Sequence, residues 1–268
     1  MRKINFWKMS GAGNDFVLLT GGRLGTGTLK KLAIRLCAQK LAVGADGLLY
    51  VGGAGKNAVS MRYFNSDGSE AFCGNGSRCS AWWAYSAGLV KGKKFTLKTI
   101  SGELPVEIKG PESVRMRMPD VGDVKLGHRG GYPAGVKTVY FLNTGVPHAV
   151  VPMGGLEHAD VHNLGRSLRY NKAFGPKGTN VDFVHIRGGK IHVRTYERGV
   201  EAETLACGTG ITASAVALTL AGRVKAPVTL VARSGETFRV WLKAAGAGAS
   251  DIYIQGPAKI VFEGEIKC

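Results

Sequence analysis

The sequence predicts an α/β fold of the α+β type, in which two homologous halves each wrap a mostly antiparallel or mixed sheet around a central apolar helix. Three observations favour this fold: a long internal repeat, short strand-like runs between turn residues, and one apolar helix at the same place in each half. The halves are expected at residues 1–119 and 120–257, and a final strand at 258–268 is expected to join the first half.

The internal repeat is clearest around two cysteines. Cys73-Gly74-Asn75-Gly76 recurs as Cys207-Gly208-Thr209-Gly210, an offset of 134 positions (207 minus 73). Other matched pieces keep their order at nearly the same offset: 11–14 with 145–148, 80–81 with 214–215, 87–88 with 221–222, and 101–103 with 234–236. Duplicated halves usually pack around a pseudo-two-fold axis, so we expect the two CGxG segments to face each other.

Local patterns assign the elements of each half. Strand-like runs occur at residues 16–19, 48–51, 59–64, 95–98 and 114–118. One helix per half begins at the CGxG loop and continues to Ala87 or to Leu220, with Gly88 and Gly222 at the C-cap. Because these two helices are apolar nearly all round, we expect them to be buried. Weaker helices are expected near residues 28–39 and 157–167.

Composition excludes several classes of protein. The chain has 268 residues, a net charge of +17 and five cysteines. It shows no apolar stretch long enough for a membrane span and no signal-peptide pattern, so a cytoplasmic protein is expected. The basic residues are dispersed, which does not favour nucleic-acid binding. CxxC zinc spacing is absent, so structural zinc is not expected, and neither a strand-following GxGxxG nor a P-loop is present.

Cys73 and Cys207 each stand just before a helix N-terminus. Such an N-terminus carries unpaired N–H groups and about half a unit of positive charge, which stabilises a thiolate. The pKa of each thiol is therefore expected to fall from about 8.5 toward neutrality. The same N–H groups can bind a carboxylate, and the glycines allow close approach. Two thiols on opposite faces of an α-carbon would suit stereoinversion, because one can remove the α-proton and the other can deliver a proton to the opposite face. The N–H groups would stabilise the enolate-like charge that develops between the two transfers.

Polar residues flank these loops and are candidates for substrate contacts. All of them lie at or near turns: Asn14, Asn65, Asp67, Glu70, His148, Asn180, Glu197 and Arg198. Asn65 and Glu197 end apolar strands at corresponding places in the two halves. His148 corresponds to Asn14 in the repeat, so both are expected to line the same cavity.

These segments resemble the diaminopimelate epimerase family. The similar motifs are residues 8–16, 65–78 and 197–210, with a further match at 255–258. The resemblance implies interconversion of L,L- and meso-diaminopimelate in lysine and peptidoglycan precursor synthesis, a cleft between two domains, no metal, no cofactor such as PLP, and a homodimer. It also implies that Cys73 and Cys207 are the two bases.

The resemblance assigns roles to the remaining site residues. The backbone around Gly74-Asn75 and Gly208-Thr209 would hold the reacting carboxylate. The distal end of the substrate would be bound by Asn14, Asn65, Asn180 and Arg198. Glu197 would contact a substrate nitrogen, and His148 would stand near a thiol. Two positions depart from the family pattern: Val146 replaces an Asn, for which Asn143 or a water is expected to substitute, and Gly47 replaces a Gln found in some members.

Three alternatives remain open. The first is a two-cysteine racemase or epimerase of another amino acid, although Asn65, Asn180 and Arg198 together favour a second carboxylate. The second is a thiol redox protein that uses the same cysteines, which leaves the glycine-rich anion loops unexplained. The third is a basic binding protein, which would show salt-dependent affinity for nucleic acid and leaves the repeated cysteine loops unexplained.

Overall fold

A computed structural model describes residues 3–267. The chain divides into two compact units, Met1–Met116 with Gly256–Cys268, and Arg117–Gln255. The sequence placed the boundaries at 119/120 and 257/258. The second unit begins three residues earlier and ends two residues earlier than expected, because strands β8 (Ser113–Arg117) and β17 (Gly248–Pro257) each run on from one unit into the first residues of the next.

The first unit contains nine strands and two helices within the described residues. Its elements are β1 (Lys3–Gly11), β2 (Asn14–Thr20), α1 (Thr26–Leu36), β3 (Gly47–Gly53), β4 (Ala58–Asn65), β5 (Glu70–Ala71), α2 (Gly74–Ser86), β6 (Lys94–Thr99), β7 (Gly102–Gly110), β8 (Ser113–Arg117) and β18 (Lys259–Lys267). The sheet runs β18-β1-β2-β3-β4-β6-β7-β8, and β5 also pairs with β4. The β2–β3 and β4–β6 pairs are parallel and the others antiparallel.

The second unit repeats this order. Its elements are β9 (Lys125–Leu126), β10 (Tyr140–Asn143), β11 (Pro147–Pro152), η1 (Leu156–His158), α3 (Val161–Arg169), η2 (Lys172–Phe174), β12 (Asn180–Arg187), β13 (Lys190–Glu197), β14 (Ala202–Thr204), α4 (Gly208–Leu220), β15 (Val228–Val231), β16 (Thr237–Ala245) and β17 (Gly248–Pro257). The sheet runs β9-β10-β11-β12-β13-β15-β16-β17, and β14 also pairs with β13. Here β11–β12 and β13–β15 are the parallel pairs.

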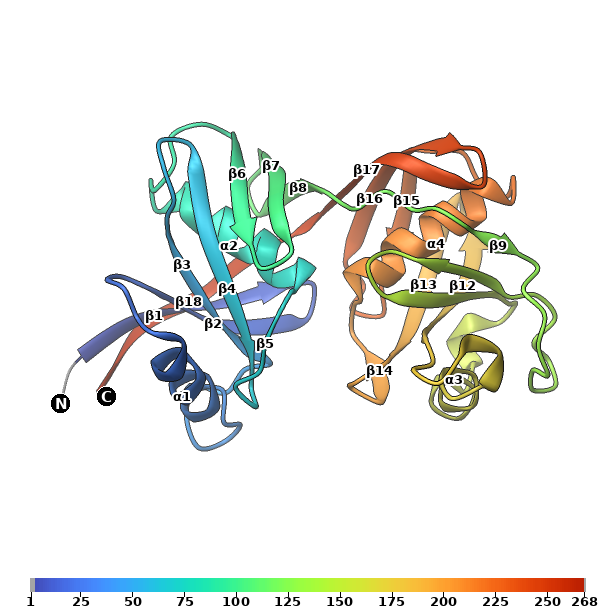
Figure 1. The fold of residues 1–268 in the computed structure, drawn as a ribbon, viewed down its shortest axis with the longest axis horizontal. Helices are drawn as coiled ribbons and strands as arrows, with labels where there is room; N and C mark the ends of the chain where they lie inside the picture. Colours follow the sequence, from blue (N-terminus) through green and yellow to red (C-terminus); the bar gives the residue numbers. More distant parts are fainter. Residues whose placement is uncertain (1–2, 268) are drawn as a thin grey trace. The chain divides into compact units, whose positions relative to one another are not determined.

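Each sheet curls around one helix, which follows from the apolar character of that helix. In Figure 1, α2 and α4 each lie within the strands of their own unit. Apart from its two ends, α4 is buried almost all round, from Gly210 to Leu218. The outer helices α1 and α3 contact β3–β4 and β12–β13, respectively. The predicted mixed α+β architecture is confirmed.

The ends of the helices reflect capping. Gly88 and Gly222 follow α2 and α4 with φ of 73° and 68°, the left-handed conformation in which a helix commonly ends on glycine. The outer helices differ from expectation. Helix α1 ends at Leu36 rather than near residue 39. Helix α3 begins at Val161 rather than near 157, because the carboxylate of Asp160 accepts a hydrogen bond from the Asn163 amide (3.1 Å) and caps the helix there.

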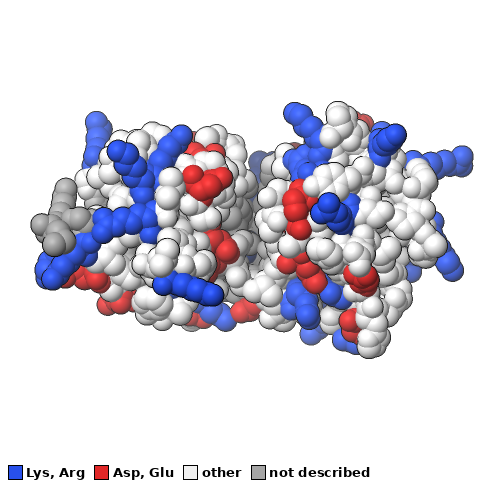
Figure 2. All heavy atoms as spheres, turned by 90° about the horizontal axis from the view of Figure 1, so that it is seen from below, with Lys and Arg blue, Asp and Glu red and all other residues white. Residues whose placement is uncertain are grey.

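Charge is spread over the surface of both units. Figure 2 shows Lys and Arg side chains projecting from separate places on the visible face, with Asp and Glu side chains among them. Several of these charges form pairs, such as Lys3–Glu265 (2.8 Å) and Lys243–Asp251 (2.7 Å). In the described part of the chain, no helix has the length and apolar character needed to cross a membrane.

Candidate active site

Cys73 is the N-cap residue of α2. Its backbone is extended (φ −139°, ψ 113°), and its Sγ accepts a hydrogen bond from the Gly76 amide at 3.3 Å. The Cys73 carbonyl accepts bonds from the amide and hydroxyl of Ser77, both at 2.9 Å, which fixes the first turn. The sulfur of a partly exposed cysteine therefore lies at the positive end of a buried helix, where a thiolate is stabilised.

A chain of hydrogen bonds ties this helix start to the β1–β2 hairpin. The fully buried Arg78 donates to Asn75 Oδ1 (2.7 Å), and Asn75 Nδ2 donates to Asn14 Oδ1 (2.9 Å). Asn14 Nδ2 donates to Asp46 in turn. The structure thus brings together Asn14 and Asn75, two of the predicted binding residues, beside the Cys73 loop.

Asn65 belongs to a separate polar network at the end of β4. Its Oδ1 accepts a hydrogen bond from the Tyr63 hydroxyl (2.8 Å), and its Nδ2 donates to Ser69 Oγ (2.9 Å). Tyr63 also explains the departure at Gly47. A Cβ at Gly47 would lie 2.4 Å from the Tyr63 ring and 2.6 Å from the Phe64 carbonyl oxygen. The Tyr63 ring and the Phe64 carbonyl therefore leave room only for glycine at position 47, which pairs with Asn65 in the β3–β4 register.

Cys207 is the N-cap residue of α4 with a similarly extended backbone (φ −116°, ψ 110°), but its side chain makes no capping hydrogen bond within the described residues and its electrostatic environment differs. The residue is buried, with Sγ 3.3 Å from the Thr209 hydroxyl. The expected fall in the pKa of this thiol is wrong for this structure. Burial raises the pKa of Cys207 well above its usual value, Glu197 and Asp182 raise it further, and interactions with Thr209 and the Gly210 amide oppose them only in part. Desolvation and the two carboxylates together outweigh the interactions with Thr209 and Gly210.

His148 is held by a residue that the sequence did not single out as a site residue. The fully buried His148 is 2.7 Å through Nδ1 from Asp182 Oδ2, and Thr195 Oγ1 donates to Asp182 Oδ1 (2.8 Å). The Nε2 atom of His148 is buried and has no hydrogen-bond partner among residues 3–267. Asp182 corresponds to Asp46 in the internal repeat at an offset of 136 positions (182 minus 46), and the two aspartates bind the corresponding residues His148 and Asn14.

The remaining predicted residues of the second unit form a cluster at the ends of β12 and β13. Asn180 Nδ2 donates to the Pro147 carbonyl (3.0 Å), and Asn180 Oδ1 accepts from the Arg198 backbone amide (2.8 Å). Glu197 is close enough to Cys207 to raise the pKa of its thiol. The structure thus places Asn180 beside Arg198, and Glu197 near Cys207.

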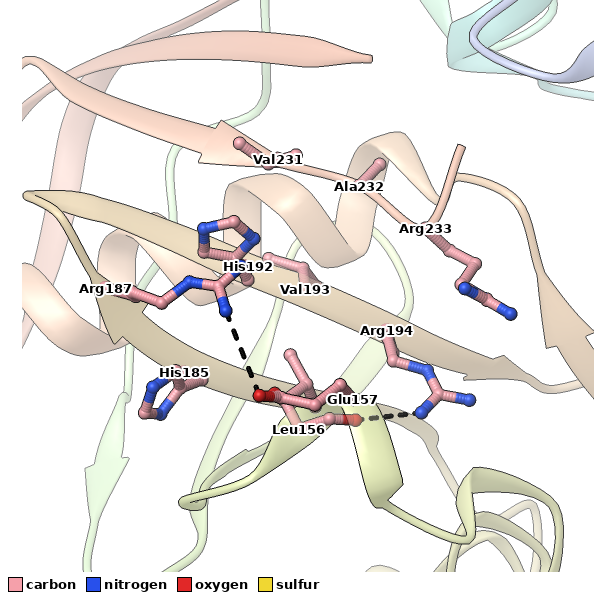
Figure 3. Close-up of a pocket in the computed structure, with 10 residues that line it drawn as sticks. All are labelled: Leu156, Glu157, His185, Arg187, His192, Val193, Arg194, Val231, Ala232 and Arg233. Carbon is pink, nitrogen blue, oxygen red and sulfur yellow. Dashed lines mark hydrogen bonds and ion pairs between the residues drawn. The ribbon is translucent and has the colours of Figure 1, made fainter. Parts of the chain in front are cut away.

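A surface hollow of the second unit lies apart from these residues. It has a volume of about 140 Å³ and is lined by side chains of β12, β13, η1 and the end of β15, among them Arg187, Arg194 and Arg233 (Figure 3). None of the predicted site residues lines it. Among residues 3–267, no group of three or more His, Cys, Asp and Glu side chains is arranged to hold a metal ion.

Comparison with known proteins identifies the family. The family model described as diaminopimelate epimerase matches residues 6–124 and 140–261. The chain belongs to the diaminopimelate epimerase family. A diaminopimelate epimerase of Aquifex aeolicus is 40% identical, with 98% of each chain covered. Another from Archaeoglobus fulgidus is 38% identical over 99% of this chain and 97% of the relative. Membership makes the chain an isomerase, an amino-acid epimerase.

Solved structures show the same fold at low sequence identity. A Bacillus anthracis phenazine biosynthesis protein of the PhzF family aligns with a TM-score of 0.76 at 17% identity, covering 100% of both chains. A hydroxyproline epimerase from Agrobacterium vitis aligns with a TM-score of 0.73 at 16% identity, covering 99% of this chain and 91% of that one. The diaminopimelate epimerase family thus shares its architecture with proteins of other names.

Proposed function

We propose that the protein interconverts L,L- and meso-diaminopimelate by a cofactor-independent reaction in which Cys73 and Cys207 are the two bases. Family membership supports the substrate. The position of both cysteines as N-caps of buried helices supports the mechanism. The reaction would serve lysine and peptidoglycan precursor synthesis, in a cytoplasmic homodimer.

The two thiols divide the proton transfers. One thiolate removes the α-proton from one face of the substrate, and the other thiol delivers a proton to the opposite face. Negative charge develops on the α-carboxylate between these two steps, after the α-proton has left. Backbone N–H groups around Gly74-Asn75 and Gly208-Thr209 would stabilise that charge, because preorganised helix-start dipoles need no reorganisation during the reaction.

The environment of Cys207 supports its role as the proton donor in the free enzyme. Because burial, Glu197 and Asp182 raise the pKa of this thiol, Cys207 holds its proton at neutral pH. Cys73 is more exposed, and its sulfur accepts the Gly76 amide, which favours the thiolate. One thiolate and one thiol is the state that a two-base reaction requires before its first step.

Polar residues of both units would recognise the substrate. Asn14, Asn65, Asn180 and Arg198 are proposed to bind the distal amino acid group, which carries both charges. Glu197 is proposed to contact a substrate nitrogen, and His148 to assist at a thiol. A side chain amide is missing at Val146, and we propose that Asn143 or a water takes its place; Asn143 Oδ1 accepts the Gly145 amide (2.8 Å) in the same turn.

The occurrence of a cysteine N-cap on the central helix of each unit carries this proposal, and isotope exchange tests it. Purified, reduced protein is incubated with L,L-diaminopimelate in D2O without added cofactor. The wild type is expected to yield meso product with deuterium at one α-carbon. Cys73→Ala and Cys207→Ala are expected to lose at least about 1,000-fold in kcat, within the range for removing an essential catalytic group.

Cys37→Ala is the matched control, because Cys37 is a buried cysteine at the C-cap of α1, outside the CGxG loops. This variant should keep activity within a few-fold of the wild type. If diaminopimelate is inert while another amino acid exchanges its α-proton, the substrate is wrong and the two-thiol mechanism survives. Full activity in either active-site variant would contradict the mechanism itself.

A further inference from the structure

The same ion pair occurs at the same place in both units. Arg62 binds Glu70 through two parallel hydrogen bonds, Nε to Oε1 and Nη2 to Oε2, both at 2.7 Å. Arg194 binds Glu203 in the same manner, again at 2.7 Å for both bonds. The register also matches, since Glu70 pairs with Phe64 and Glu203 with Tyr196, each two residues beyond the arginine.

Each arginine also reaches the segment that begins the outer helix. Arg62 Nη2 donates to the hydroxyl of Thr26, the first residue of α1 (2.8 Å). Arg194 Nη1 donates to the carbonyls of Leu156 (2.8 Å) and Ala159 (3.1 Å), just before α3. Figure 3 shows the Arg194 guanidinium extending from β13 toward Leu156. Each arginine therefore links its strand to the glutamate of a short strand and to the start of the outer helix (Arg62) or the segment just before it (Arg194).

These short strands lead directly to the cysteines. Strand β5 has only two residues, Glu70–Ala71, and Cys73 follows two residues later. Strand β14 ends at Thr204, three residues before Cys207. Backbone pairing over so few residues holds a segment weakly, so the side-chain bonds from arginine are a large part of what fixes its path. A bidentate guanidinium–carboxylate pair also fixes orientation, which a single ion pair does not.

We propose that Arg62–Glu70 and Arg194–Glu203 are positioning pairs, each of which sets the location of the catalytic thiol in its own unit. The inference rests on the proposed function in that it takes Cys73 and Cys207 to be the reacting groups. Neither pair touches the reacting atoms. Each acts through the strand that it holds, and proton transfer is sensitive to such displacement, since a shift of about 1 Å can cost about 100-fold in rate.

The local nature of the two pairs gives a crossed test. Arg62→Lys and Arg194→Lys keep the positive charge but cannot form the bidentate hydrogen bonds to the glutamate. Glu70→Gln and Glu203→Gln serve as second variants should a lysine variant fail to fold. Arg115→Lys is the matched control, because Arg115 also binds a glutamate, Glu107, across neighbouring strands β7 and β8.

Two quantities are measured for each variant. The first is the rate of alkylation of each cysteine by iodoacetamide from pH 6 to pH 10, read peptide by peptide by mass spectrometry. The second is kcat and KM for diaminopimelate. The alkylation measurement does not depend on the substrate, so the positioning inference remains testable if the proposed substrate is wrong.

The expected result is selective. Arg62→Lys should change the alkylation profile of Cys73 and leave Cys207 unchanged, and Arg194→Lys should do the reverse. Each should lower kcat by about 10- to 100-fold with KM within about 3-fold, whereas Arg115→Lys should alter none of these quantities. Unchanged profiles, or a change in both cysteines that Arg115→Lys reproduces, would overturn the inference in favour of general stabilisation.

Discussion

Cys207 lies near two carboxylates, Glu197 and Asp182, in a buried position, and this combination determines its acidity. Asp182→Asn and Glu197→Gln each remove one negative charge. Both variants should lower the pKa of the Cys207 thiol, so its alkylation profile should move to lower pH. Glu197→Gln should have the larger effect, because Glu197 contributes more than Asp182. Burial remains, and the pKa should stay above the usual value in both variants.

Alkylation of Cys207 between pH 7 and pH 10 measures this effect. At a fixed pH below the pKa, the rate of alkylation follows the thiolate fraction, so both variants should react faster than the wild type. Glu157→Gln is the control, since Glu157 is an exposed carboxylate of the same unit and does not contribute to the acidity of Cys207. Slower reaction in Asp182→Asn would mean that its bond to His148 matters more than its charge.

Residues within a continuous motif were predictable from the sequence, and residues that act through contacts across strands were not. Cys73 and Cys207 stand out because the glycine-rich turn and the helix follow them directly. Asp182 and Arg194 lie inside strands, and their partners His148 and Glu203 are distant in sequence or across a turn. Nothing in local sequence shows which carboxylate becomes buried, so the raised pKa of Cys207 could not be foreseen.

The central helices begin with glycines that have different neighbours. A Cβ at Gly210 would lie 2.2 Å from Asp182 Oδ1, an atom already fixed by Thr195. A Cβ at Gly76 would meet only the end of the Leu49 side chain closer than 3.0 Å (2.8 Å), and that side chain can rotate. Gly210→Ala should therefore destabilise the protein by about 1–3 kcal/mol, the usual cost of overpacking a core.

Gly76→Ala is the matched comparison at the corresponding helix position. The gain from replacing a helical glycine, about 0.4–1 kcal/mol, offsets much of the contact with Leu49. The free energy of unfolding of this variant should therefore lie within about 1 kcal/mol of the wild-type value. Urea unfolding monitored by circular dichroism measures both. Equal destabilisation of the two variants would show that the Asp182 side chain moves aside readily.

At the scale of helices and strands, the sequence predicted the elements that have a clear apolar pattern. The central helices were found because they are apolar all round and end in glycine. Strand β1 was not found, since its Lys and Ser residues lie between apolar ones at an edge covered later by β18. The start of α3 depends on a cap from Asp160, and the apolar pattern alone placed it near residue 157.

The path of the chain makes the first unit depend on its last strand. β18 pairs with β1 from Lys3–Lys267 to Ser10–Lys259, and Ile266 packs against the hydrophobic core of the first unit. Just before β18, the Pro257 carbonyl accepts a hydrogen bond from the buried Arg78 (3.3 Å). The second unit is completed before this segment is reached.

Removal of residues 259–268 should therefore destabilise one unit selectively. β1 would lose its outer partner, and apolar side chains of the core would be exposed to water. Amide hydrogen exchange followed by mass spectrometry should show β3 and β4 exchanging at least about tenfold faster, equivalent to about 1.4 kcal/mol, while β12 and β13 keep their protection. Uniform loss of protection in both units would mean that they unfold as one cooperative body, and unchanged protection in β3 and β4 would mean that β18 is dispensable for the core of the first unit.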